Sequence, residues 1–220
     1  MFNNRTSQIV RNKVQHFTDK FERGELLGEG GFGSVYKCWR KGSRVEGGKF
    51  YALKVLKKDD HKAGWAARLL KNELVILKQM NHPNIVRIYE LFQDETDYFI
   101  VQELMEGSTI LKTIETRPHL FTERQVAKIV AHILKGLEFL HSQCIIHRDI
   151  KGENILLDKK MTEDNLEVVA KIADFGLSCY CDPTSKGISL YCGTDLYMAP
   201  EMLKLKANPS TLPERYKSNV

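Results

Sequence analysis

The sequence predicts an α+β fold of two lobes, the first rich in β-strands and the second mostly α-helical. Short alternating apolar runs fill the first half, and a long helical pattern opens the second half. The composition shifts near residue 106. A length of 220 residues suits two such lobes. We therefore expect an N-terminal leader over 1–20, a β-rich lobe over 21–105 and an α-rich lobe over 106–220.

Composition and charge argue against several classes of protein. Hydrophobic residues make up 42% and charged residues 28%, which is typical of a globular domain. The net charge is +5, but no stretch combines Lys and Arg with aromatic residues, so we expect no nucleic-acid partner. No apolar run is long enough for a membrane span, and the N-terminus has no signal-peptide core. The five scattered cysteines favour reduced thiols and a cytoplasmic location.

A glycine-rich stretch separates the first two predicted strands. The run FERGELLGEGGFGSVYKCW is typical of strand, turn and strand, and four of the six residues from Gly28 to Gly33 are glycine. Alone, the pattern Gly-x-Gly-x-x-Gly fits a loop that covers phosphates, a flexible hairpin or chance. Two further strands, IVRIYELF and YFIVQEL, are predicted later in this lobe.

Two charged residues of the first lobe occupy positions that disfavour charge. The run GGKFYALKVLKK alternates, so Ala52, Lys54 and Leu56 share one face of a strand. Residues 63–80 change to helical spacing, with Glu73 inside the apolar stripe. A buried charge is unfavourable unless it is paired. Lys54 and Glu73 therefore form an ion pair with each other, or both reach solvent.

The second lobe begins with a well-defined helix. Residues 122–141 carry apolar side chains at helical spacing, and Thr122 with Gln125 predicts a capping box at the start. The apolar positions are Val126, Ile129, Val130, Ile133, Leu134, Leu137 and Leu140. Two short strands, ENILLD and VVAKIAD, follow, and residues 176–200 are mostly irregular. Long loops inside compact domains are often functional.

Polar residues gather beside those two short strands. The run HRDIKGEN, residues 147–154, holds two carboxylates, two cations and an amide, which is too much chemistry for a structural turn. Asp174 stands at the end of the second strand, and Gly176 follows shortly after it. This pattern would also fit a plain turn. Asn154 and Asp174, at neighbouring strand ends, are better explained as oxygen ligands of Mg²⁺.

Taken together, these motifs resemble a eukaryotic protein kinase in identity, order and spacing. They are the glycine loop, YALK, an acidic residue in the next helix, HRDIKGEN, DFG and APE. The resemblance covers the chain from Phe21 onward and implies a bilobal protein-kinase-like fold. Lys151 and Thr194 are similar to the serine/threonine class. The chain looks most like the calcium/calmodulin-dependent and calcium-dependent protein kinases.

The resemblance implies ATP and Mg²⁺ as cofactors and a role for each motif residue. The implied catalytic residues are Asp149, which would accept the substrate proton, Lys151, which would stabilise the transferred phosphoryl group, and Asn154. Asn154 and Asp174 would hold Mg²⁺. Lys54, held by Glu73, would bind the α- and β-phosphates. The residues implied to bind ATP are Gly28, Glu29, Gly30, Gly31, Phe32, Gly33, Val35, Ala52, Lys54, Glu73, Glu103, Met105 and Leu156.

Two further expectations concern regulation and the extent of the second lobe. In the kinases that the chain resembles, the arginine at Arg148 pairs with a phosphate on the activation loop. Ser189 is the preferred phosphosite here, with Thr184 and Ser185 as alternatives. The family continues past APE with more helices, whereas nineteen residues follow Glu201. We therefore expect a C-terminally truncated catalytic domain with an incomplete second lobe, and a partner that covers it.

The predicted function is transfer of the γ-phosphoryl group of ATP–Mg to Ser or Thr hydroxyls of protein substrates. One alternative is a truncated kinase-like protein that binds ATP or a partner without efficient catalysis. Another is a nucleotide-binding module outside the kinase family. The presence of Lys54, Asp149, Asn154 and Asp174 favours catalysis, since a protein that only binds ATP has no need of the base.

Overall fold

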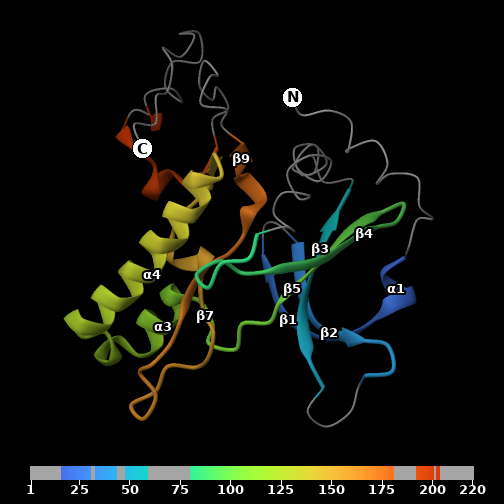
Figure 1. Ribbon diagram of the computed structural model, residues 1–220, viewed down its shortest axis with the longest axis horizontal. Helices are drawn as coiled ribbons and strands as arrows, with labels where there is room; N and C mark the ends of the chain where they lie inside the picture. The colour runs from blue at the N-terminus through green and yellow to red at the C-terminus, as the bar shows by residue number, and fades with distance from the viewer. Residues whose placement is uncertain are drawn as a thin grey trace. The chain divides into compact units, whose positions relative to one another are not determined.

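The chain divides into two compact units in the computed structural model (Figure 1). Unit 1 comprises Met1–Ala63 and Tyr89–Gln102, and unit 2 comprises Gly64–Ile88 and Glu103–Val220. The structure describes residues 16–30, 33–43, 48–58, 80–180, 192–200 and 202–203. The predicted helix over 63–80 falls almost wholly outside these residues, as do residues 181–191 of the predicted activation loop.

Unit 1 is built on an antiparallel sheet with the strand order β1-β2-β3-β5-β4. All strands predicted for the first lobe are present, which confirms the β-rich character of this region. The elements are α1 (Phe17–Lys20), β1 (Phe21–Gly30), β2 (Gly33–Arg40), β3 (Phe50–Lys57), β4 (Ile88–Gln93) and β5 (Asp97–Glu103).

Strand register divides the sheet of unit 1 into two chemically different faces. Val35 lies opposite Lys54, and Ala52 is two residues before Lys54, so these three side chains share one face. Cys38 lies opposite Tyr51 on the other face. The predicted alternation along β3 is therefore confirmed.

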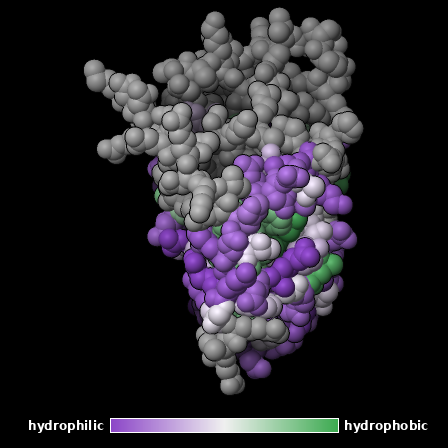
Figure 2. All heavy atoms as spheres, turned by 90° about the vertical axis from the view of Figure 1, so that its right-hand side faces the viewer, coloured by the Kyte–Doolittle hydropathy of each residue, from purple (hydrophilic) through white to green (hydrophobic). Residues whose placement is uncertain are grey.

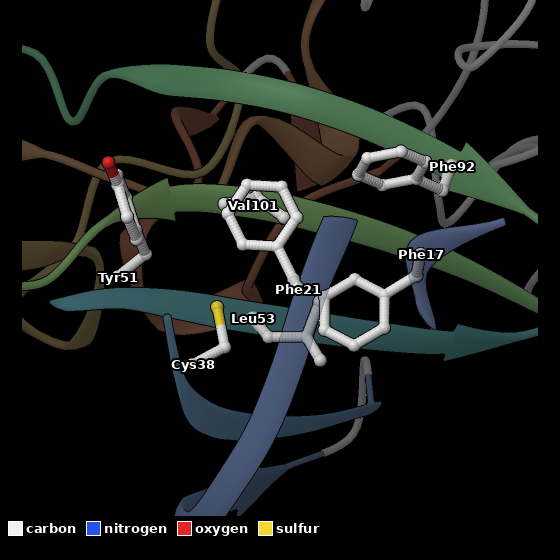
Figure 3. Close-up of a cluster of buried hydrophobic side chains, with 7 residues drawn as sticks. All are labelled: Phe17, Phe21, Cys38, Tyr51, Leu53, Phe92 and Val101. Atoms are coloured by element: carbon white, nitrogen blue, oxygen red, sulfur yellow. The ribbon is translucent and has the colours of Figure 1, made fainter. Parts of the chain in front are cut away.

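An apolar cluster covers the second face (Figure 3). Its buried members are Phe17, Phe21, Cys38, Tyr51, Leu53, Phe92 and Val101. The ring of Phe17, from α1, stacks on Phe21 with centroids 5.8 Å apart, and Phe21 meets Tyr51 edge to face at 5.7 Å. Aromatic contacts of this kind add to the stabilisation from burial alone. The short helix before β1 therefore belongs to the core of unit 1.

Cations lie over several aromatic rings of the sheet. The Nζ atom of Lys37 is 4.3 Å from the ring centroid of Phe50, and that of Lys49 is 4.8 Å from the ring centroid of Tyr89. Such contacts cover ring surface with the stem of a charged side chain. Across its described residues, the face drawn in Figure 2 is mostly hydrophilic with small hydrophobic areas.

Unit 2 contains the longest helix of the described residues, two short strand pairs and three isolated β-bridges. Its helices are α3 (Ile110–Thr116) and α4 (Glu123–Ser142), and its strands are β6 (Ile145–Ile146), β7 (Ile155–Leu157), β8 (Ala170–Ile172) and β9 (Cys179–Tyr180). Short 3-10 helices are η1 (Pro118–Leu120), η2 (Gly152–Asn154), η3 (Phe175–Leu177) and η4 (Asp195–Tyr197). None of the described helices is long and apolar enough to cross a membrane.

The predicted helix over 122–141 is confirmed as α4. The Oγ1 atom of Thr122 accepts a hydrogen bond from the N–H of Gln125 at 3.3 Å, so Thr122 is the N-cap. Ile129 and Leu140 are buried. Val126, Val130 and Leu134, which have the same helical spacing, are 43%, 44% and 59% exposed.

The strand β8 has hydrogen-bonding partners on both of its edges. It pairs antiparallel with β7, and Ile85 bridges Ile172 on its other edge. Helix α4 packs against β8. A Cβ atom at Gly136 of α4 would lie 2.9 Å from both Asn84 O and Ile172 Cδ1, so glycine permits this close packing.

Candidate functional site

The glycine turn of unit 1 is shaped by a backbone conformation that favours glycine. Gly30 pairs with Gly33 across the turn, whose two residues, Gly31 and Phe32, lie outside the described part of the chain. Gly33 has φ +118°, and a Cβ atom there would lie 2.1 Å from Val55 O. At Gly28 a Cβ atom would meet nothing within 4 Å. Close approach to β3 therefore explains Gly33, whereas it does not explain Gly28.

Next to this turn, one face of the sheet carries three of the predicted ATP-binding side chains. Val35 and Lys54 are half-buried and Ala52 is buried. Glu29 lies at the end of β1, where its Oε1 atom accepts a hydrogen bond from Ser34 Oγ at 3.1 Å. Glu73 lies outside the described residues, so its ion pair with Lys54 stays a prediction.

Glu103 is the first residue of the second sequence segment of unit 2, Glu103–Val220. Both its backbone and its side chain make hydrogen bonds. Its N–H donates to Arg87 O at 2.8 Å, and its Oε2 accepts from the N–H of Arg87 at 3.2 Å. Its Oε1 is 2.6 Å from Lys171 Nζ. Because the N–H of Glu103 is already hydrogen-bonded to Arg87 O, its carbonyl is the backbone group that could accept a hydrogen bond from the edge of an adenine base. Met105 and Leu156, the other predicted ATP contacts of this unit, are half-buried.

Asp149 is the centre of a buried polar network in unit 2. Asp149 is only 5% exposed. Oδ1 accepts a hydrogen bond from Thr194 Oγ1 at 2.7 Å, and Oδ2 accepts one from Asn154 Nδ2 at 2.9 Å. The ammonium of Lys151 lies 3.0 Å from Oδ2 and donates to Thr194 Oγ1 at 2.7 Å. Three side chains thus fix the position and orientation of one carboxylate.

The approach of Thr194 to Asp149 depends on an unusual backbone conformation. Gly193 has φ +116°, and a Cβ atom there would lie 2.8 Å from Arg148 O. Arg148 itself has φ +68°, in the left-handed region, and its Nε donates to Leu177 O. Two segments far apart in the sequence therefore meet closely enough for the Thr194 hydroxyl to reach the carboxylate.

His147 is hydrogen-bonded to the backbone of Asp149 and of Ala173. It is 1% exposed, and its ring meets Phe175 edge to face with centroids 5.2 Å apart. The N–H of Asp149 donates to Nδ1 at 3.3 Å, which places the ring proton on Nε2, 2.9 Å from Ala173 O. Burial lowers the pKa of His147, so the imidazole is neutral near pH 7.

The predicted Mg²⁺ ligands lie at neighbouring strand ends. Ile155 pairs with Ile172, and the N–H of Ala173 donates to Asn154 O at 2.8 Å, so Asp174 follows directly beside Asn154. Asp174 has φ +58°, and its Oδ1 accepts from the N–H of Gly176 at 3.2 Å. The Asn154 amide nitrogen donates to Asp149 O and Oδ2, which directs the amide oxygen away from Asp149.

This donor set fits Mg²⁺. One carboxylate and one amide oxygen suit a hard cation that is completed by water and substrate phosphates, not by an all-protein cage. Among the described residues, no group of three or more His, Cys, Asp or Glu could hold a metal ion.

The structure brings the predicted catalytic residues Asp149, Lys151 and Asn154 together, with Asp174 adjacent. The predicted phosphosites Ser189, Thr184 and Ser185 lie outside the described residues. Sequence reasoning noted Thr194 as a class marker but missed its bond to Asp149. No local pattern signals this bond, because it joins two residues 45 positions apart.

Comparison with known proteins connects this arrangement to a family. A family model described as protein kinase domain matches residues 21–213. Calcium-dependent protein kinase 4 of Plasmodium berghei is 34% identical over 205 residues, which cover 92% of this chain and 37% of that protein. Calcium/calmodulin-dependent protein kinase type IV of Rattus norvegicus is 36% identical over 196 residues, with coverages of 89% and 38%.

A third relative comes from an insect. Serine/threonine-protein kinase PLK4 of Aedes aegypti is 35% identical over 185 residues, which cover 84% of this chain and 22% of that protein. The chain thus spans well under half of the length of these relatives. The matches confirm the resemblance inferred from the motifs, including the similarity to the calcium-dependent and calcium/calmodulin-dependent group.

Proposed function

Because the chain belongs to the protein kinase domain family, we propose that it transfers the γ-phosphoryl group of ATP to Ser or Thr hydroxyls of protein substrates. The observation that carries this proposal is the buried carboxylate of Asp149, held by Thr194, Asn154 and Lys151. Phosphoryl transfer needs little covalent chemistry from the protein, so catalysis is mainly positioning and electrostatics.

Asp149 accepts the proton of the substrate hydroxyl in this proposal. Donors at both of its oxygens hold the carboxylate in one orientation, which lowers the entropic cost of aligning it with the hydroxyl. Lys151, 3.0 Å from Asp149 and bonded to Thr194, carries a positive charge beside the same position. That charge would stabilise the negative charge on the transferred phosphoryl group.

Asn154 and Asp174 would hold Mg²⁺, which neutralises phosphate charge when it is bound. Their placement follows from the pairing of β7 with β8 and from the bond between Ala173 N–H and Asn154 O. The tie between Asn154 Nδ2 and Asp149 joins the metal ligand to the base. A shift of either residue would therefore displace the other.

Unit 1 would supply the loop that covers the phosphates and two of the side chains that contact the adenine. The backbone from Gly28 to Gly33 would cover the phosphates, with Phe32 at the tip, and Lys54 paired with Glu73 would bind the α- and β-phosphates. Val35 and Ala52 share the face of Lys54 and would contact the adenine from this unit. From unit 2, Leu156 and the backbone of Glu103 and Met105 would contact the base.

The proposal extends to regulation and location. Arg148, bonded through Nε to Leu177 O, would pair with a phosphate on Ser189, Thr184 or Ser185 and order the activation segment. A cytoplasmic location is proposed because the five scattered cysteines favour reduced thiols. The domain boundaries at residues 20 and 105 and a partner on unit 2 also stay proposals.

The test is incorporation of labelled phosphate from ATP–Mg into a generic protein substrate by the 220-residue chain. We expect phosphoserine and phosphothreonine in the product, at a rate well above that of Asp149→Asn. Transfer no faster than the variant, with ATP still bound, would replace the proposal with the kinase-like binding protein. Absence of saturable nucleotide binding by the folded chain would contradict both.

A further inference from the structure

The edge of β8 that faces away from β7 is completed by side chains as well as by backbone. At Ile172 the partners are backbone groups, since its N–H donates to Asn84 O and its carbonyl accepts from the N–H of Val86, each at 2.9 Å. At Ala170 the partners are side chains. Asn84 Nδ2 donates to Ala170 O at 3.1 Å, and the N–H of Ala170 donates to His132 Nδ1 at 3.3 Å.

His132 therefore satisfies a backbone donor in the interior of unit 2. Ala170 is 0% exposed, and a buried N–H without an acceptor is unfavourable. Helix α4 carries His132 and packs against β8, which brings the imidazole to this edge. An apolar side chain at position 132 would cover Ala170 but leave its N–H without this acceptor.

The end of β8 connects this edge to the metal ligand. Ala173, directly after β8, donates its N–H to Asn154 O at 2.8 Å and accepts from His147 Nε2 at 2.9 Å. Asp174 is the next residue. Ala170 is the first residue of the three-residue strand β8, and Asp174 lies two residues after the strand ends. Because the strand is hydrogen-bonded along its length, a shift at Ala170 would be passed on to Asp174.

We propose that His132 is a positioning residue that holds β8, and with it Asp174, only while its imidazole is neutral. The consequence for catalysis rests on the function proposed above, whereas the hold on β8 does not. A neutral ring keeps the lone pair of Nδ1 for the N–H of Ala170. Protonation places a hydrogen on Nδ1, so two N–H groups face each other and the bond is lost.

The surroundings of His132 set the pH range of this change. The charged groups that face it are Lys128 and Lys135 of α4 and Asp158 after β7. Partial burial and the two lysines lower its pKa, while Asp158 raises it, and the net direction is downward. The ring is therefore neutral near pH 7 and gains its proton below about pH 6.5, the ordinary pKa of histidine.

The experiment compares the full chain with His132→Gln and His132→Leu. The amide oxygen of Gln can accept the bond of Ala170 but does not titrate, whereas Leu offers no acceptor. His141→Gln is the matched control, because it removes another histidine of α4. Amide hydrogen exchange of the β8 peptide, corrected for the intrinsic pH dependence, and phosphoryl transfer are both measured from about pH 4.5 to 8.

For the wild type and His141→Gln we expect exchange at β8 to rise about tenfold as His132 gains its proton in acid, as one lost hydrogen bond predicts. His132→Gln should show a smaller rise in acid, since His147 and His82 of unit 2, whose pKa values burial also lowers, still titrate there. His132→Leu should show high exchange throughout. The acid limb of the transfer rate should move to lower pH in His132→Gln and stay in place in His141→Gln.

Two results would overturn the proposal. One is exchange at β8 in wild type that does not change with pH. The other is wild-type protection in both His132 variants. If the full chain transfers no phosphoryl group, the exchange data still decide whether His132 holds β8, so that outcome counts against the proposed function and not against the hold.

Discussion

Units 1 and 2 present their functional groups by different physical means. In unit 1 the backbone determines where the functional groups lie. Strand register places Val35, Ala52 and Lys54 on one face, and the conformation of Gly33 shapes the turn. In unit 2 side chains decide, because Asp149 is positioned by hydrogen bonds and an ion pair from residues up to 45 positions away.

This difference predicts which substitutions each unit tolerates. A backbone-defined site is sensitive to residues that cannot adopt its φ angle and less sensitive to polar exchanges. A buried polar network is sensitive to isosteric changes that remove one donor, because the remaining partner is left unsatisfied.

The largest expected effect is on the network of unit 2. Asn154→Ala removes both hydrogen bonds to Asp149 and the amide oxygen proposed for Mg²⁺. We expect single-turnover phosphoryl transfer to fall by about 10²-fold or more, as losses of one positioned polar group do. Asn165→Ala, at a half-buried asparagine whose side chain bonds to Lys160 O, is the control. Equal rates for the two variants would show that the network does not position Asp149.

The turn of unit 1 should respond to backbone strain. Gly33→Ala must accept φ +118° and a contact of 2.1 Å with Val55 O, so we expect the free energy of unfolding to fall by about 2–4 kcal/mol. Gly28→Ala meets nothing within 4 Å and should change it by less than about 0.5 kcal/mol. Denaturant unfolding of both variants measures the difference. Similar losses would mean that close approach at Gly33 is unimportant.

A smaller effect is expected for one hydroxyl of the network. Thr194→Val keeps the shape of the side chain but removes its bonds to Asp149 and Lys151. We expect kcat to fall by about tenfold to a hundredfold with little change in the KM for ATP. Thr194→Ser should restore most of kcat. A rise in KM with unchanged kcat would instead assign Thr194 to substrate binding.

The smallest effect is the pH dependence of stability, which should differ between the units. Burial lowers the pKa of His147 and of His82 in unit 2. The unfolded chain binds more protons below about pH 6.5, so this stability is present above that pH and is lost as the pH falls. Burial raises the pKa of Cys38 in unit 1 to about 12, so its contribution is lost as the pH rises above about 9.

Hydrogen exchange resolved by unit tests this contrast. As the pH falls, amide hydrogen exchange should increase first in unit 2. As the pH rises, it should increase first in unit 1. Cys38→Ala should remove much of the alkaline effect on unit 1. Deprotection of both units together at each extreme would contradict the assignment of these groups.

Local patterns explain what could be predicted from the sequence. The two-residue period of β3 and the helical period and Thr122 cap of α4 are properties of single segments, and both are confirmed. Helix α3 was not predicted, because seven residues present no complete apolar stripe. The stripe of α4 alone cannot show that Val126 is exposed while Ile129 is buried, since burial depends on the packing around the helix.

Long-range contacts explain what could not be predicted. The bond between Thr194 and Asp149 depends on the close approach of Gly193 to Arg148, which no spacing reveals. His132 belongs to the same class, because a histidine in a helix shows no sign of the strand edge that it meets.

The most direct test of the account compares Asp149→Asn with Lys54→Met in nucleotide binding and in single-turnover transfer. Asp149→Asn should slow transfer by about 10²–10⁴-fold, the usual contribution of a general base, while the Kd for ATP–Mg stays within about twofold. Lys54→Met should weaken nucleotide binding as well as transfer. If Asp149→Asn weakens nucleotide binding as strongly as Lys54→Met and leaves transfer from the bound complex intact, Asp149 is not the base.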